Sequence, residues 1–119
     1  MFSQSSEFGK TKGLNWINGS VTTINGKNIR LPHNGWNRIE IKEGSELIKN
    51  EGENPFFYFN HSLSVKPDDP DFKIMGTTVY GEKFISFGKK NKNIYGIQPH
   101  PEKSQLAGLN LLKNFLILW

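Results

Sequence analysis

Short apolar runs separated by Gly, Asn, Pro and Asp follow one another from residue 14 to residue 98. This pattern predicts a chain made mostly of β-strands. Residues 20–24 and 28–31 flank Asn25-Gly26-Lys27, and we expect a β-hairpin there because Asn-Gly takes the positive φ angles of a tight turn. Residues 38–42 alternate polar with apolar side chains, which is the period of a strand buried on one face.

A continuous apolar run, Phe56-Phe57-Tyr58-Phe59, lacks this alternation. It predicts a core strand that is covered on both faces. Two segments rich in Lys, Asp, Asn and Pro, residues 66–70 and 89–93, are expected to be solvated loops. Further strands are expected at residues 74–80, 84–87 and 94–98.

The last segment changes its period, because its large apolar side chains fall three or four residues apart. This spacing predicts an amphipathic helix from about Ser104 to Leu118, with Ser104 placed to cap the first free amides. The pattern lasts for only two heptads, which is too short for a coiled coil. We therefore expect core packing for its apolar residues, Leu106, Leu109, Leu112, Phe115 and Leu116.

Composition excludes several classes of protein. The 15 Lys and Arg residues are scattered among 11 Asp and Glu residues, so the formal charge of +4 gives little support for nucleic-acid binding. The chain has no apolar run long enough to span a bilayer and no export signal, so we expect a cytoplasmic protein without membrane contact. With zero Cys, and with His33, His61 and His100 far apart in sequence, neither a metal site nor a cofactor is expected.

The chemistry is concentrated where the last expected strand meets the helix, in Gln98-Pro99-His100-Pro101-Glu102. Pro101 keeps His100 extended and excludes regular ladder pairing, so the side chains of His100 and Glu102 can project from the same side. The Glu102 carboxylate can then fix the tautomer of the His100 imidazole, which can take a proton from a nucleophile. On spacing alone, a simple polar turn is the alternative.

The segment Gly-Ile-Gln-Pro-His-Pro-Glu-Lys-Ser, residues 96–104, resembles the Gly-Val-Gln-Phe-His-Pro-Glu-Lys-Ser signature of class I glutamine amidotransferases. The resemblance implies that His100 is the base and Glu102 the orienting acid of a Cys-His-Glu triad. Pro99 replaces the usual Phe, which removes an aromatic contact and an amide donor beside the histidine. The implied fold is an α/β, flavodoxin-like amidotransferase domain.

Upstream segments are similar to the glutaminase subunit of imidazole glycerol phosphate synthase. Pro-His-Asn-Gly-Trp-Asn, residues 32–37, resembles a motif near the family's contact with the cyclase subunit, which implies that Trp36 and Lys103 belong to that interface. Without the resemblance, Trp36 would be read as a buried indole after a turn. The resemblance thus implies a heterodimer with the cyclase subunit.

The segment around His61, Ser62 and Leu63 resembles a stretch that lies along the bound glutamine in this family, although Leu63 replaces a Tyr. The resemblance implies that these three residues contact glutamine. Taken alone, His61 at the end of an apolar strand is more often a buried histidine with satisfied hydrogen bonds.

The resemblance extends to Ser5-Ser6-Glu7-Phe8-Gly9, which in the family follows the Gly-x-Cys-x-Gly turn of the nucleophile. We therefore expect residues 1–119 to be the C-terminal part of one amidotransferase domain, mostly β-strands with a C-terminal helix, without the nucleophile. Neither His100 nor Glu102 can replace a thiolate, so the chain alone should be inactive. A split or frameshifted gene, a misassigned start or a deliberate piece would each explain such a fragment.

The implied function of the intact protein is to split glutamine into glutamate and ammonia. The ammonia would pass to the cyclase that makes imidazole glycerol phosphate in histidine biosynthesis. Two alternatives stay open. One is a paralogous glutaminase that feeds a sugar-modifying synthase for surface polysaccharide, and the other is a non-catalytic remnant.

Overall fold

The computed structural model describes residues 2–5, 11–42, 45–49, 51–52 and 54–118, with residues 2–5 described by their backbone. Residues 6–10, which hold most of the Ser-Ser-Glu-Phe-Gly motif, lie outside the described residues. Within these ranges no helix is long and apolar enough to cross a membrane.

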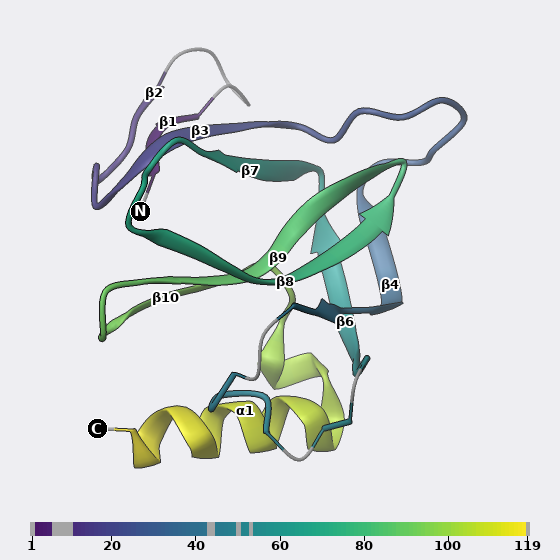
Figure 1. The fold of residues 1–119 in the computed structure, drawn as a ribbon. Coiled ribbons are helices and arrows are strands. Elements are labelled where there is room, and N and C mark those ends of the chain that lie inside the picture. The colour runs from purple at the N-terminus through teal and green to yellow at the C-terminus, as the bar shows by residue number, and fades with distance from the viewer. Residues whose placement is uncertain (1, 6–10, 43–44, 50, 53, 119) are drawn as a thin grey trace.

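The described strands form two four-stranded sheets and a two-stranded sheet, and α1 (Gln105–Ile117) lies below them in the view of Figure 1. The upper sheet has the order β2 (Thr11–Lys12), β1 (Phe2–Ser5), β3 (Ile17–Thr23) and β7 (Leu63–Pro67). The middle sheet has the order β10 (Ile94–Ile97), β9 (Glu82–Lys90), β8 (Phe72–Tyr80) and β5 (Glu40–Ile41). The third sheet pairs β4 (His33–Arg38) with β6 (Phe56–His61). The expected strands at 74–80, 84–87 and 94–98 are thus confirmed as β8, β9 and β10.

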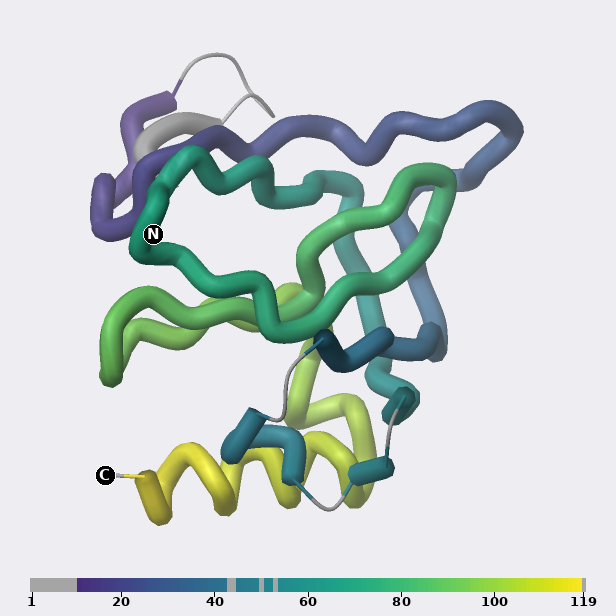
Figure 2. Tube along the Cα trace, in the orientation of Figure 1, coloured from purple at the N-terminus to yellow at the C-terminus, as the bar shows by residue number. Residues whose placement is uncertain are grey.

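The expected hairpin around Asn25-Gly26 is wrong. Residues 28–31 form no strand, and β3 pairs instead with β7 and β1, which are distant in sequence. The backbone amide of Ile24 then donates to the Ser62 carbonyl at 2.9 Å, so the pairing with the β7 side continues past the end of β3. The intervening loop crosses to β4, as the trace in Figure 2 shows. Long-range pairing has therefore overridden a strong local turn signal.

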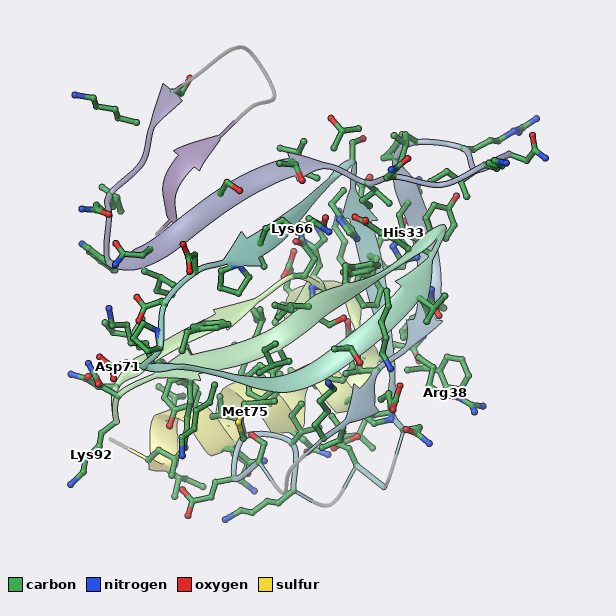
Figure 3. The ribbon with its side chains drawn as sticks, turned by 45° about the horizontal axis from the view of Figure 1, so that its top comes forward. His33, Arg38, Lys66, Asp71, Met75 and Lys92 are labelled. Carbon is green, nitrogen blue, oxygen red and sulfur yellow. The ribbon has the colours of Figure 1, made fainter. Side chains whose placement is uncertain are left out.

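The run from Phe56 to Phe59 is a strand, β6, but it is covered on one face only. Phe57 and Phe59 are fully buried, whereas Phe56 is 51% exposed. The guanidinium of Arg38, labelled in Figure 3, lies 5.0 Å from the centre of the Phe56 ring on the outer side. The outer face is apolar because it carries aromatic residues at the surface, not because a second layer covers it.

One apolar core joins the middle sheet, β6 and α1. Phe57 and Phe59 of β6 pack there with Leu111 of α1, and Ala107 and Phe115 of the helix contact the same cluster. Removing this apolar surface from water is the main force that holds the layers together. Its buried members are Ile39, Leu47, Ile48, Phe57, Phe59, Met75, Phe84, Phe87 and Leu111.

The helix is present, as expected, but most of its leucines do not pack in the core. Gly108, Leu111 and Asn114 form its buried stripe, while Leu106 is 68% and Leu116 is 73% exposed. The Asn114 amide donates to the Leu47 carbonyl at 3.0 Å, which satisfies this buried polar group. The helix is therefore apolar on two sides, and the side that is richer in leucine faces away from the described residues.

Candidate functional site

His100 and Glu102 face each other after the end of β10, at the start of the 3-10 helix Pro101–Lys103. The Nδ1 atom of His100 lies 2.9 Å from Oε1 of Glu102, within the hydrogen-bond reach expected from the sequence. His100 has an extended backbone, with φ −96° and ψ 101°, and Pro101 begins the 3-10 helix. The proline therefore sets the turn that points both side chains the same way.

The backbone of His100 is anchored to the middle of β6. Its amide donates to the Tyr58 carbonyl at 2.9 Å. The Ser104 hydroxyl donates to the His100 carbonyl at 2.6 Å and accepts from the Tyr58 amide at 3.0 Å. The expected capping of α1 by the Ser104 side chain is thus wrong, because this buried hydroxyl is used to join two distant backbone segments.

Gly108 lets α1 approach the loop that carries the pair. A Cβ atom at this position would lie 1.8 Å from the Pro101 carbonyl oxygen, far inside any tolerated contact. The Gly108 amide donates to the Ser104 carbonyl at 3.2 Å as the helix begins. The first turn of α1 therefore packs directly on the backbone that positions Glu102.

The electrostatics of the pair favour an ionised carboxylate. The pKa of Glu102 is lowered, first by a hydrogen bond from its own backbone amide and then by the hydrogen bond from His100. A carboxylate that accepts a hydrogen bond from the Nδ1–H group fixes the imidazole tautomer and leaves Nε2 free to exchange protons with a substrate. The pair can therefore orient a histidine for general acid–base chemistry.

A hollow of about 370 Å³ lies beside this segment. Gln98, two residues before His100, lines it and is tied to β9 by a hydrogen bond from its amide to the Ser86 carbonyl at 2.8 Å. The structure thus brings His61, Ser62 and Leu63 to the same hollow as the strand end that leads into His100. Its lining residues are Val21, His61, Ser62, Leu63, Val65 and Gln98.

A family model for glutamine amidotransferase class-I matches residues 6–119. The chain belongs to the class I glutamine amidotransferases. This finding agrees with a histidine and a glutamate that face each other after a strand end.

Amidotransferases similar to this chain include three proteins named imidazole glycerol phosphate synthase subunit HisH. The protein of Chlorobaculum tepidum is 40% identical over 95% of this chain and 56% of its own length. That of Pelagibacter ubique is 41% identical over 92% of this chain and 52% of its own. That of Pyrococcus furiosus is 39% identical over 97% of this chain and 58% of its own. The chain thus spans slightly more than half the length of the curated relatives it matches.

A solved structure gives the same fold assignment for this amidotransferase. A protein of Thermoplasma acidophilum that is named as a GMP synthase component superimposes with a TM-score of 0.65 and 16% identity. The match covers 84% of this chain and 48% of the other. The α/β amidotransferase fold expected from the sequence is therefore confirmed, and this chain is its strand-rich part with the C-terminal helix.

Trp36 and Lys103 of the amidotransferase both lie near the ring of Tyr58 on the outer side of β6. The Trp36 ring meets the Tyr58 ring edge-on at 6.0 Å, and the Lys103 ammonium lies 5.9 Å from the centre of the same ring. Trp36 is 47% exposed, so it is not the buried indole of the alternative interpretation. The two residues share one exposed face.

Sequence reasoning missed several residues that build the site. Tyr58, Ser104 and Gly108 hold the loop, and His33 contacts His61 although 28 residues separate them. A glycine inside a helical pattern was the one local signal available, because such a residue often marks a close backbone approach. Among the described residues, no group of three or more His, Asp or Glu side chains could hold a metal ion.

Proposed function

We propose that this chain is the acid–base and substrate-holding part of a glutaminase, which works with a segment that supplies the cysteine nucleophile. The observation that carries the proposal is the 2.9 Å contact between His100 Nδ1 and Glu102 Oε1 beside the hollow at residues 61–63. Glutamine would lie in this hollow, contacted by His61, Ser62 and Leu63. The reaction would yield glutamate and ammonia.

The proposed steps need no group other than the triad and water. The thiol proton moves to Nε2 of His100 while sulfur bonds to the carboxamide carbon. The imidazolium, stabilised by Glu102, then gives this proton to the leaving nitrogen, and ammonia departs. Water attacks the thioester, His100 takes a proton from the water, and the proton returns to sulfur as glutamate is released.

The relatives support a place in histidine biosynthesis, because their name is that of a subunit of imidazole glycerol phosphate synthase. We propose that ammonia passes to a cyclase subunit that binds the face formed by Trp36, Tyr58 and Lys103. Trp and Tyr side chains at the surface are enriched at protein interfaces, and the charge of Lys103 beside them can steer a partner of opposite charge.

The central experiment measures ammonia release from glutamine. The 119-residue chain alone should give only background, since it has no cysteine. Addition of the N-terminal part of a family member, with its Gly-x-Cys-x-Gly turn, should restore hydrolysis. In that mixture His100→Ala should lower kcat by several powers of ten, because the thiol is then not activated.

The matched control is Lys92→Ala at the exposed turn between β9 and β10, labelled in Figure 3. Lys92 does not line the hollow, so this change should leave the rate unchanged. Turnover by the bare chain would contradict the proposal. So would a restored activity that does not depend on His100. A mixture that binds but stays inactive would favour the non-catalytic alternative.

The partner face has its own test. Lys103→Glu should weaken binding of the cyclase at least tenfold while changing the free energy of unfolding by less than about 0.5 kcal/mol. Lys92→Glu adds the same charge change on an exposed turn away from Tyr58 and should leave cyclase affinity as it is. Equal affinities for both variants would remove Lys103 from the interface.

A further inference from the structure

A chain of three hydrogen bonds runs through two histidines and ends on the segment proposed to hold glutamine. The Asn37 amide nitrogen lies 3.2 Å from His33 Nε2. His33 Nδ1 lies 3.0 Å from His61 Nε2, and His61 Nδ1 lies 2.7 Å from the Leu63 carbonyl oxygen. We call this series, Asn37–His33–His61–Leu63, the histidine relay.

When both rings are neutral, only one placement of their protons satisfies all three hydrogen bonds of the relay. The Leu63 carbonyl can only accept, so the His61 proton must be on Nδ1, and its Nε2 is then an acceptor. His33 must therefore donate from Nδ1, which leaves its Nε2 to accept from the Asn37 amide. An added proton on either ring would place two N–H groups face to face. The Leu63 carbonyl at one end of the relay therefore fixes the tautomers of both histidines, and the Asn37 amide at the other end matches them.

The His33 ring is held by packing as well as by its nitrogens. His33 and His61 are direct partners in the β4–β6 pairing, and His33 is only 3% exposed. The His33 ring, labelled in Figure 3, stacks on the rings of Tyr80 and Phe59, with centroid distances of 4.1 Å and 4.9 Å. A phenyl ring would fill this aromatic stack without burying polar atoms, so packing alone does not account for an imidazole there.

The relay ends at a bend where the chain changes sheets. It leaves β6 at His61 and enters β7 at Leu63. The Ser62 carbonyl accepts from the Ile24 amide at 2.9 Å, and the Leu63 carbonyl accepts from His61. The planes of two successive peptide groups are thus fixed at the rim of the hollow.

We propose that His33 is a positioning residue that acts through His61 to hold Ser62 and Leu63 in the orientation that receives the substrate. The inference deepens the proposed function, since it takes from it the role of residues 61–63 in binding glutamine. His33 itself does not line the hollow. Its donor nitrogen, and not its bulk, carries the effect.

Two substitutions at His33 test its hydrogen-bond donor and its aromatic ring separately. His33→Asn keeps a nitrogen donor near the position of Nδ1 and loses the stacked ring, whereas His33→Phe keeps the ring and loses the donor. Ring-nitrogen NMR spectra of the ¹⁵N-labelled full chain report the tautomer of His61. We expect the proton on Nδ1 in the wild type and in His33→Asn. In His33→Phe we expect the Nε2 signal to lose its hydrogen-bonded shift and the Leu63 amide to exchange about tenfold faster.

A third variant tests the relay from its surface end, without a change in the core. Asn37→Asp removes the amide donor, so the carboxylate should draw the His33 proton to Nε2 and break the contact with His61. The matched control is Asn34→Asp on the other face of β4, where the side-chain oxygen accepts from the Tyr58 hydroxyl at 2.6 Å and an aspartate can do the same. Only Asn37→Asp should change the His61 spectrum.

In the mixture with the nucleophile segment, His33→Phe and Asn37→Asp should raise the KM for glutamine about tenfold or more, with a smaller change in kcat. His33→Asn should stay near the wild type. Identical spectra and exchange in His33→Phe and wild type would overturn the relay, and so would equal effects of Phe and Asn. An unchanged KM would overturn the positioning role. If the wild-type mixture released no ammonia, the proposed function would fail, while the spectra would still decide the relay.

Discussion

The β4–β6 pair and helix α1 are both apolar, but they differ in how completely the described residues cover them. Phe57 and Phe59 on the inner face of β6 are fully buried, and the polar atoms of His33 and His61 beside them have partners. On α1, by contrast, Leu106, Leu109 and Leu116 are exposed. The difference teaches that the described residues cover the inner face of the β4–β6 pair completely, whereas they leave the outer side of the helix open.

The lengths of the relatives suggest why the outer side of α1 is exposed in this chain. Because the chain spans 52% to 58% of three curated relatives, a large part of each is not matched by it. An exposed apolar surface of this kind usually marks an interaction site. We expect the outer side of α1 to contact the rest of a complete domain, and the following variants test the contrast between the two regions.

The largest effect is expected inside the closed region. Phe59→Ala should lower the free energy of unfolding by about 3–5 kcal/mol, because it removes a fully buried ring and leaves a cavity. That ring contacts His33, His61 and Phe84. Urea denaturation followed by circular dichroism measures the change, and a loss below about 1 kcal/mol would show that the core is loosely packed.

The second-largest effect is expected from low pH, which should reduce the free energy of unfolding through His33 in the β4–β6 pair. Burial, followed by the charge of His61, lowers the pKa of His33 from 6.5 to about 4. The unfolded chain therefore binds a proton before the folded chain does, so stability falls as the pH decreases from about 6.5 to about 4. At about 1.4 kcal/mol per pKa unit, the loss is at most about 3 to 4 kcal/mol. Burial also lowers the pKa of His61, which has the same sign.

Urea denaturation at a series of pH values measures this loss of stability. The substitution His33→Phe should flatten the dependence of the free energy of unfolding on pH between about 6.5 and 4. The carboxylates with lowered pKa, such as Glu82 and Glu102, lose their contribution as the pH falls below their ordinary pKa of 4.5, so they do not mimic the effect between pH 6.5 and 4.5. A wild-type stability that is constant between pH 6.5 and 4.5 would contradict a neutral, buried His33.

The boundary between the two regions can be tested at Gly108. Alanine is ordinarily the better helix residue by about 1 kcal/mol, but here its Cβ would meet the Pro101 carbonyl oxygen. We expect Gly108→Ala to destabilise the chain by about 1–3 kcal/mol and to loosen the contact between His100 and Glu102. Thermal unfolding gives the sign, and an increase in stability would mean that α1 does not press on the loop.

The smallest effect is expected on the open side of α1. Leu116→Gln should change the free energy of unfolding by less than about 0.5 kcal/mol in the isolated chain, since the side chain is already in solvent. Once the nucleophile segment is bound, the same substitution should weaken its affinity. A large loss in the isolated chain would show that this face is covered there.

Local sequence patterns predicted the elements that pair with their neighbours in the chain, and failed where distant partners decide. β8, β9 and β10 follow one another in sequence and in the sheet, and alternating or apolar runs with turn residues were sufficient to find them. The hairpin at Asn25-Gly26 failed because β3 pairs with β7, some 40 residues later. Periodicity shows that a helix has an apolar side, but it does not show which side the rest of the fold covers.

Within the site, too, contacts between residues near in sequence could be predicted, and contacts between distant residues could not. His100 and Glu102 are two residues apart, so their contact follows from local geometry and could be predicted. The capping expected of Ser104 was wrong because a hydroxyl that precedes a helix usually caps it, whereas here its partner Tyr58 is 46 residues away. His33 and His61 are too distant in sequence to suggest a joint role, yet the β4–β6 register makes them neighbours.

Strand β6 sets the distance between the backbone anchor of His100 and the start of the proposed substrate segment. The carbonyl of Tyr58 holds the backbone of His100, and His61 ends the same strand three residues later. At about 3.3 Å per residue, the anchor of the base and the start of the substrate segment are about 10 Å apart along one extended backbone. One inserted residue between them would lengthen this distance and turn His61 toward the Trp36 side, so insertions in this family member should be tolerated before Phe56 or after Pro67 but not within the strand.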